Sequence, residues 1–192
     1  MILYIHGFLS APQSFKARLI AARMAELGMP DAFACPKLAG DPMEIVATIE
    51  RAVDASSDEP ALIGSSLGGF YVTHVAERFG LKTVLLNPAV RPHDLLHDYL
   101  GVHRNLYTGE EIVVEPRHLD ELRALDVQTL VDPSRYFLIA TTGDEVLDYR
   151  QAVAKYRGAR QLVIEGGDHS LDSLPAYLDD VLRFCGVPMR GS

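Results

Sequence analysis

The sequence predicts an α/β fold in which a mostly parallel sheet of about six strands carries helices on both faces. Along the 192 residues, short apolar runs rich in β-branched residues alternate with amphipathic helical patterns. The apolar runs are nearly continuous rather than alternating with polar residues, which is typical of strands buried on both faces. The chain is 48% hydrophobic and 23% charged, an ordinary balance for one globular domain. We therefore expect residues 1–192 to form a single domain.

We expect six apolar runs to form strands. Turn residues or helical patterns lie between one run and the next. They lie at residues 1–6, 32–36, 61–65, 83–87, 136–141 and 161–165.

Helical patterns occupy the intervals between these strands. The first opens at Ser10, where Gln13 suits a capping box, and it ends at Gly28. The second opens at Asp41, with Glu44 placed to reach back to the helix start. Further helices are expected at residues 68–79, 146–156 and 173–185.

The interval between the strands at 83–87 and 136–141 is far longer than one crossover requires. It contains two helical patterns, Pro92–Leu100 and Arg117–Val127, which a polar turn around residues 107–109 joins. We interpret about residues 91–132 as a helical, lid-like insertion between the fourth and fifth strands. It is expected to lie over the carboxyl edge of the sheet.

Residues 64–69 read Gly-Ser-Ser-Leu-Gly-Gly and match the pattern G-x-S-x-G, with Ser66 at the centre. A nucleophilic serine projects from a tight strand-to-helix turn, and glycines at positions 64 and 68 avoid side-chain clashes there. The expected strand before this segment and helix after it fit that role. The alternative is a glycine-rich turn without catalytic function, and the neighbouring Ser65 should point back toward the sheet.

The order serine, acid, histidine is typical of this kind of site. Of the seven histidines, only His169 lies in a loop just beyond the last expected strand, so it is the candidate base. Asp144 follows the strand at 136–141 and is the candidate acid. Its rival Asp148 falls in the next helical pattern, and Asp168 is too close to the base in sequence to reach its ring well.

The first expected strand ends in His6-Gly7-Phe8. A His-Gly pair at this place precedes a backbone amide that faces the oxyanion, so the N–H groups of Phe8 and Leu67 are the candidate oxyanion hole. His6 is expected to hold this loop rather than act as a base. The alternative is an ordinary glycine at the end of a strand.

Composition excludes several other classes of function. The formal net charge is −8 and no dense run of Lys or Arg occurs, which argues against nucleic acid and anionic membranes as partners. The two cysteines form no disulfide framework, and no metal-ligand spacing is present, so we expect neither a metal nor another cofactor. No targeting segment or bilayer-spanning apolar run is recognised, and the cytoplasm is the expected location.

With the three candidate residues placed, the sequence resembles the YqiA/YcfP family of small bacterial α/β-hydrolase esterases, and its YqiA-type members most closely. The resemblance extends over almost the whole chain and rests on residues 4–8, 63–69, 87–92, 107–109, 142–149 and 164–169. It implies the triad Ser66, Asp144 and His169 and a sheet without the first two strands of the full α/β-hydrolase fold. It further implies activity on acyl-CoA thioesters and simple aryl esters. Asp168 stands where the YqiA type is expected to have Asn.

These observations favour a serine hydrolase that cleaves small-molecule acyl esters or thioesters through an acyl-enzyme. Tyr99 and Tyr107, with leucines of the insertion, are expected to contact the substrate. Arg91 either binds an acyl-carrier phosphate or carboxylate, or fixes the insertion through an ion pair. Two alternatives remain: a hydrolase of carbon–carbon bonds on the same fold, and a catalytically silent binding protein.

Overall fold

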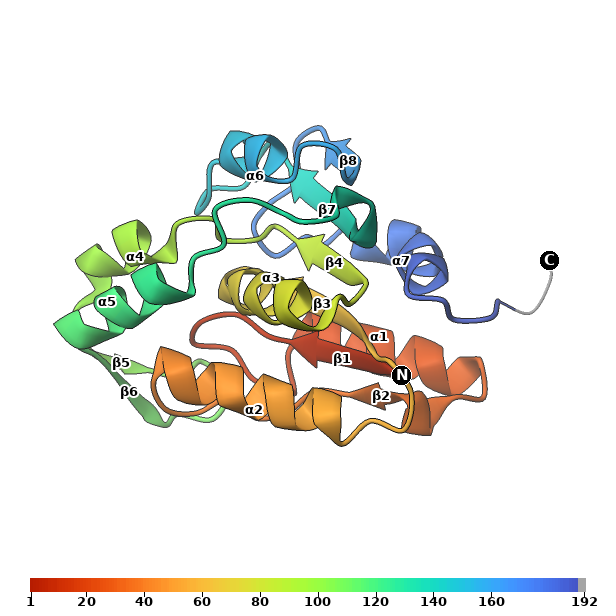
Figure 1. Ribbon diagram of the computed structural model, residues 1–192, viewed down its shortest axis with the longest axis horizontal. Helices are drawn as coiled ribbons and strands as arrows, with labels where there is room; N and C mark the ends of the chain where they lie inside the picture. Colours follow the sequence, from red (N-terminus) through yellow and green to blue (C-terminus); the bar gives the residue numbers. More distant parts are fainter. Residues whose placement is uncertain (190–192) are drawn as a thin grey trace.

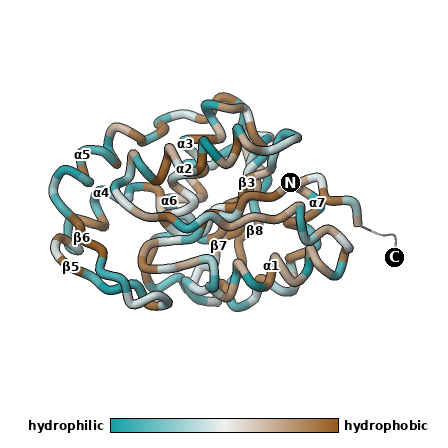
Figure 2. The backbone as a smooth tube through the Cα atoms, turned by 90° about the horizontal axis from the view of Figure 1, so that it is seen from below, coloured by the Kyte–Doolittle hydropathy of each residue, from teal (hydrophilic) through white to brown (hydrophobic). Residues whose placement is uncertain are grey.

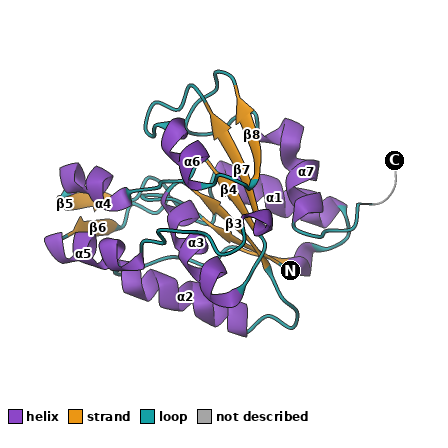
Figure 3. Ribbon diagram, turned by 45° about the horizontal axis from the view of Figure 1, so that its top comes forward, coloured by secondary structure: helices purple, strands orange, loops and turns teal. Residues whose placement is uncertain are grey.

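The computed structural model describes residues 1–189 and contains a wholly parallel six-stranded sheet (Figures 1 and 3). The predicted α/β class and strand number are confirmed. In the order β2-β1-β3-β4-β7-β8, every neighbouring pair is parallel. The strands are β1 (Ile2–Ile5), β2 (Phe33–Ala34), β3 (Ala61–Ser65), β4 (Thr83–Leu86), β7 (Tyr136–Thr141) and β8 (Arg160–Ile164).

The strand order reverses direction at β1, which lies between β2 and β3. The chain leaves β1 through α1 on one face of the sheet and leaves β3 through α3 on the other face. At such a switch point the two loops diverge and leave a crevice beyond the carboxyl ends of the strands. The loops after β1 and β3 are therefore the expected borders of a ligand site.

Seven helices lie among the described residues; most of those longer than one turn have one buried face, whereas the helix Leu67–Phe79 is buried all round over its first two turns. In Figure 2 they alternate between hydrophilic and hydrophobic colours along their length, as amphipathic helices do. They are α1 (Phe15–Glu26), α2 (Pro42–Asp54), α3 (Leu67–Phe79), α4 (Pro92–Leu95), α5 (Pro116–Leu125), α6 (Tyr149–Lys155) and α7 (Leu178–Phe184).

Two apolar cores hold the layers together, one on each face of the sheet. Helices α2, α3, α5 and α6 pack on one face, and α1 and α7 pack on the other. Successive strand residues serve opposite cores: Leu3 and Ile5 face α2 and α3, whereas Ile2 and Tyr4 face α1. This explains why the strands are apolar throughout. No helix within residues 1–189 combines the length and apolar character that crossing a bilayer requires.

Two helix starts test the capping predictions. The capping box at α2 is confirmed, since the Glu44 carboxylate accepts a hydrogen bond from the Asp41 N–H at 3.2 Å. The predicted start of the first helix at Ser10 is wrong, because α1 begins after Ser14. Residues 7–14 instead form a loop in which Leu9 adopts a positive φ of 54°.

The insertion between β4 and β7 is only partly helical, which corrects the prediction. The expected helix Pro92–Leu100 ends at Leu95 and continues as a 3₁₀ turn to Tyr99. An antiparallel hairpin, β5 (Gly101–Arg104) and β6 (Glu111–Val114), then precedes α5. Each strand has only four residues, too few for a clear two-residue period, although Ile112-Val113-Val114 favours a strand.

The hairpin is attached to the loop that follows β1. The N–H of Leu106 donates to the Leu9 carbonyl at 3.1 Å, and the Asn105 side chain donates to the Ser10 carbonyl at 2.8 Å. The Asn105 carboxamide oxygen also accepts the N–H groups of Tyr107 and Thr108. Figure 1 shows α4, α5 and the hairpin together beyond the carboxyl ends of the strands. One buried side chain thus fixes both the hairpin turn and its attachment.

Replacing Asn105 with Ala should loosen this attachment. The change leaves the Ser10 carbonyl and two turn N–H groups without a partner, which costs about 1–3 kcal/mol for a buried group. We expect a lower unfolding midpoint in urea and faster proteolytic cleavage within residues 101–114. An Asn105→Ala chain as protease-resistant as the wild type would contradict the assigned role.

Candidate active site

Ser66 lies in the tight turn between β3 and α3, in a backbone conformation that is rare for residues with a side chain. Its φ is 54° and its ψ is −124°. A Cβ on Gly64 would lie 2.6 Å from the Gly68 carbonyl oxygen, and a Cβ on Gly68 would lie 2.1 Å from the Ile5 carbonyl oxygen. The prediction that glycines avoid clashes at these two positions is confirmed. Strain of this kind persists only where the surrounding packing enforces it.

The side chains of Ser66, His169 and Asp144 form one hydrogen-bonded line. His169 Nε2 lies 3.0 Å from Ser66 Oγ. His169 Nδ1 lies 3.0 and 2.9 Å from the two carboxylate oxygens of Asp144. Because a carboxylate only accepts, Nδ1 carries the proton and Nε2 is left as an acceptor for the serine hydroxyl. Three segments distant in sequence meet in this way at the carboxyl edge of the sheet.

The Asp144 carboxylate is held in its ionised form. Its side chain is only 2% exposed, and this burial alone would raise its pKa. Hydrogen bonds from His169 and from the N–H groups of Leu147 and Val146 outweigh burial, so the pKa of Asp144 is lowered. Asp144 therefore bears a negative charge beside the imidazole at neutral pH.

The rival residues have other partners. The Asp148 carboxylate caps α6 by accepting the Arg150 N–H at 3.0 Å, and the Asp168 carboxylate accepts the Asp172 N–H at 3.3 Å. Ser65 is buried in the sheet. Asp168 thus shapes the turn after His169, while Asp148 shapes a helix start.

The loop after β1 lies against Ser66. A Cβ on Gly7 would lie 3.0 Å from Ser66 Cβ, so this loop approaches the serine as closely as a glycine allows. Buried His6 donates from Nδ1 to the Gly7 carbonyl at 3.0 Å, and burial lowers its pKa. Within residues 1–189, the N–H groups of Phe8 and Leu67 have no hydrogen-bond acceptor. Both flank Ser66 and are free to bind a ligand oxygen.

Asn87 is a residue of this site that the sequence analysis did not identify. Its buried carboxamide accepts the Thr141 N–H at 2.9 Å and donates to the Asp168 carbonyl at 2.9 Å and the His169 carbonyl at 3.3 Å. It therefore ties the end of β7, just before Asp144, to the loop that carries His169. A polar residue at the end of an apolar strand, next to Pro88, was the available signal.

A large cleft of about 750 Å³ lies along the loop after β1 and reaches Leu67, the neighbour of Ser66, although Ser66 itself does not line it. Its walls come from residues 6–13, residues 37–42, the second half of the hairpin and the start of α5. Leu67 and Tyr71 of α3 contribute to it as well. The free N–H groups of Phe8 and Leu67 belong to residues of this wall.

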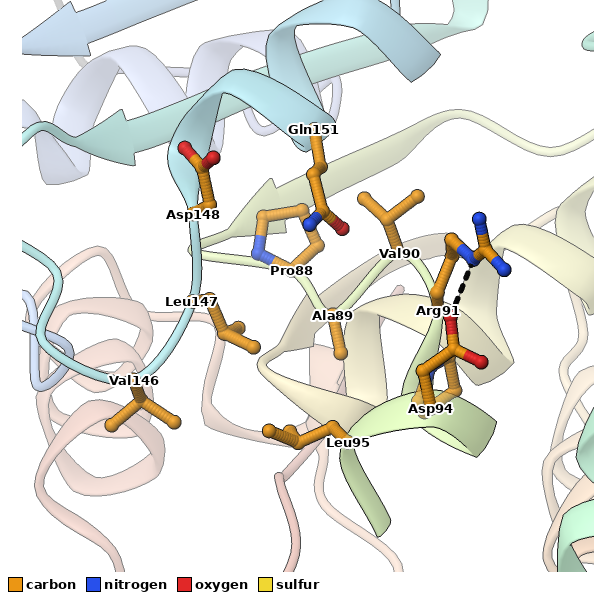
Figure 4. Close-up of a pocket in the computed structure, with 11 residues that line it drawn as sticks. Pro88, Ala89, Val90, Arg91, Asp94, Leu95, Val146, Leu147, Asp148 and Gln151 are labelled. Atoms are coloured by element: carbon orange, nitrogen blue, oxygen red, sulfur yellow. Dashed lines mark ion pairs between the residues drawn. The ribbon is translucent and has the colours of Figure 1, made fainter. Parts of the chain in front are cut away.

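A small cleft of about 280 Å³ lies on the other side, between the loop after β4 and the loop before α6 (Figure 4). The side chains of Ala89, Leu95 and Leu147 point toward one another there. Arg91 lies at its edge and forms an ion pair with Asp94 at 2.7 Å.

The candidate substrate contacts Arg91, Tyr99 and Tyr107 do not line the large cleft. The Tyr99 ring packs edge-on against Phe8, with centroids 6.1 Å apart, and is 39% exposed. Tyr107 is 50% exposed on the hairpin turn.

Comparison with known proteins agrees with this architecture. The model of a family described as "Uncharacterised protein family (UPF0227)" matches residues 1–186. Est1E from Butyrivibrio proteoclasticus superimposes with a TM-score of 0.72 at 18% identity, over 96% of this chain and 88% of that one. Mouse alpha/beta hydrolase domain-containing protein 10 gives 0.72 at 18% identity, over 95% and 89%.

The esterase domain of a Rhodothermus marinus protein is also similar, with a TM-score of 0.64 at 23% identity over 94% of this chain and 83% of that domain. These likenesses establish the α/β-hydrolase fold.

Changing Asn87 to Asp should impair any reaction that uses the three aligned side chains. Asp has the same shape and can still accept the Thr141 N–H, but it cannot donate to the Asp168 and His169 carbonyls. We expect kcat to fall by roughly 10-fold to 100-fold with a smaller change in KM, since slight misplacement of a catalytic group costs about this much. The control Thr141→Ser keeps its hydroxyl and should retain kcat; equal losses in both variants would contradict the role of Asn87.

The lowered pKa of Asp144 predicts a pH-dependent contribution to stability. Its folded-state pKa lies below the value of about 3.9 for an unfolded Asp, so the stabilisation is complete above that pH and disappears as the pH falls through the folded pKa. Asp144→Asn should therefore lower the urea midpoint at pH 7, and the difference from wild type should shrink in acid. The exposed Asp58→Asn serves as a control, and a gap that does not change with pH would contradict the prediction.

Proposed function

Since the chain belongs to the uncharacterised protein family UPF0227, which comprises the YqiA and YcfP proteins, we propose that it is a serine hydrolase of carboxylic esters or thioesters. The observation that carries this proposal is the continuous line from Ser66 Oγ through His169 to Asp144. Structural neighbours described as esterases and hydrolases support the same reaction class.

In the proposed reaction, Ser66 Oγ attacks the substrate carbonyl carbon while its proton passes to His169 Nε2. The imidazolium that forms is stabilised by the Asp144 carboxylate at Nδ1. The carbonyl oxygen becomes an oxyanion and accepts hydrogen bonds from the N–H groups of Phe8 and Leu67. Loss of one such donor is expected to reduce the rate by roughly 100-fold to 1,000-fold.

The tetrahedral intermediate then collapses to an acyl-enzyme. His169 Nε2 returns the proton to the leaving alcohol or thiol, and the ester bond to Ser66 Oγ remains. Water next gives a proton to His169, and its oxygen attacks the acyl carbon. Release of the acid restores the serine hydroxyl, so each step conserves protons without an added cofactor.

The start of α3 assists this chemistry because Ser66 immediately precedes the helix. The free Leu67 N–H and the positive end of the helix dipole are placed to act on the oxyanion. These donors are fixed by the fold before substrate arrives, which is the condition for efficient electrostatic stabilisation of a transition state.

A fluorophosphonate probe tests the proposal directly. Wild-type protein should form one adduct, on Ser66, and Ser66→Ala should form none and lose roughly 10⁶-fold in hydrolysis, down to background. Ser65→Ala is the matched control, because this neighbouring hydroxyl lies outside the hydrogen-bonded line and its loss should leave labelling intact. Folded wild-type protein that forms no adduct would favour a silent binding protein instead.

A further measurement accompanies this experiment. A panel of aryl esters, acyl-CoA thioesters and diketones distinguishes an esterase or thioesterase from a carbon–carbon hydrolase.

A further inference from the structure

The two sides of Ser66 are not equivalent for a bound ester. The leaving group takes its proton from His169 Nε2 and must lie on the histidine side. The large cleft runs along Phe8 and Leu67, whose N–H groups are the proposed oxyanion donors, and none of Ser66, His169 and Asp144 belongs to its wall. If the proposed function holds, as this inference requires, the acyl part of the substrate occupies the large cleft.

The floor of the large cleft is apolar and rigid. Leu67, Leu96, Val114 and Leu122 line it, and each is at least 92% buried. They come from α3, the insertion and α5, so the floor closes only when the insertion packs on the domain. Such a surface suits the carbon skeleton of an acyl group.

Tyr71 is the exception on this floor. The residue is only 3% exposed and lines the cleft, and no group within residues 1–189 forms a hydrogen bond with its hydroxyl, but this oxygen is not sealed off from solvent. Burial, with a smaller effect from Glu121, raises the pKa of Tyr71, so the hydroxyl remains a neutral donor and acceptor. A hydroxyl that solvent reaches bonds to water, and a ligand that displaces this water loses affinity unless it supplies a hydrogen-bonding group of its own.

Tyr71 also lies close to the proposed oxyanion donor Leu67. It follows Leu67 by four residues in α3, so the Cβ atoms of the two lie about one helical turn, roughly 5–6 Å, apart on the same face. The Leu67 N–H marks the proposed oxyanion position. A group that reaches the Tyr71 hydroxyl therefore lies on the acyl chain, beyond the scissile carbonyl.

The charges at the rim restrict what this group can be. Four carboxylates line the cleft. Only two of its permanently charged side chains, those of Lys37 and Arg117, are cationic. Lys37 is paired with Glu110 at 2.6 Å, and Arg117 with Glu115 at 2.8 Å and with Asp41. The net negative rim disfavours an anionic acyl chain, so the group that meets Tyr71 is not a carboxylate or another anion. The four carboxylates are those of Asp41, Glu110, Glu111 and Glu115.

We propose that the unpartnered hydroxyl of Tyr71 determines acyl specificity by hydrogen bonding to a neutral oxygen, a hydroxyl or a carbonyl, on an otherwise apolar acyl chain held in the large cleft. The preferred substrates are then esters of hydroxy- or oxo-substituted acids rather than of plain alkanoic acids. A site built to bind a substrate oxygen discriminates strongly against analogues that lack it, because its own polar group stays unpaired.

The test compares phenyl hexanoate with phenyl 3-hydroxyhexanoate and phenyl 3-oxohexanoate, for wild-type protein and Tyr71→Phe. Wild type should have a kcat/KM at least about 10-fold higher for the oxygenated esters. Tyr71→Phe should abolish this preference by lowering their kcat/KM about 10-fold to 100-fold, with phenyl hexanoate changed less than about threefold. Its melting temperature should not fall, since only an unpaired hydroxyl is removed.

Tyr99→Phe is the matched control, because that ring lies outside the large cleft and its substitution should leave the preference intact. Equal kcat/KM for all three esters in wild type, or an equal loss for all three in Tyr71→Phe, would overturn the role of Tyr71. Failure of the proposed function itself is distinguishable, because no ester would then be cleaved and Ser66 would not be labelled.

Discussion

The close contact between the start of α3 and the end of β1 is the constraint on which the site depends. Gly68 approaches the Ile5 carbonyl so closely that a Cβ would lie 2.1 Å from it. This contact brings the Leu67 N–H next to the loop that carries Phe8, and it accompanies the positive φ of Ser66. The positions of the proposed nucleophile and of the proposed oxyanion donors therefore share one backbone packing requirement.

A second layer of hydrogen bonds joins this turn to the other two candidate catalytic residues. Asn87 follows β4, the neighbour of β3, and binds both β7 and the loop after β8. Three adjacent strands are thus fixed relative to one another at their carboxyl ends. The parallel sheet supplies the common edge, and buried amide contacts supply the alignment of side chains.

The sheet and the positions of Ser66, Asp144 and His169 follow from local patterns in the sequence. Strands buried on both faces leave continuous apolar runs, and the turn at Ser66 requires glycine at two fixed spacings. The hairpin was not predicted, because four-residue strands such as β5 carry too little periodicity and their pairing depends on contacts with distant Ser10 and Leu9. Asn87 was missed for a related reason: its role depends on partners far away in sequence.

The insertion was expected to supply substrate contacts through Tyr99 and Tyr107, and local sequence could not exclude them. Neither residue lines the large cleft, and their contact with substrate stays a prediction. Tyr71 instead lies in a helix of the core, where a tyrosine among apolar residues is indistinguishable from an ordinary buried ring until the cleft beside it is known. The role proposed for its hydroxyl can be recognised only from the three-dimensional structure.

The bond from the Leu106 N–H to the Leu9 carbonyl joins the hairpin to the same short loop that presents Phe8. If the hairpin moved outward to admit a bulkier acid, the Phe8 N–H, a proposed oxyanion donor, would therefore move as well. In such an architecture, substrate range and catalytic rate are not independent traits. Mutations in the hairpin tip that widen the entrance of the large cleft would also disturb the groups around the reacting carbonyl. New specificities would therefore evolve more readily through substitutions in the floor of the cleft.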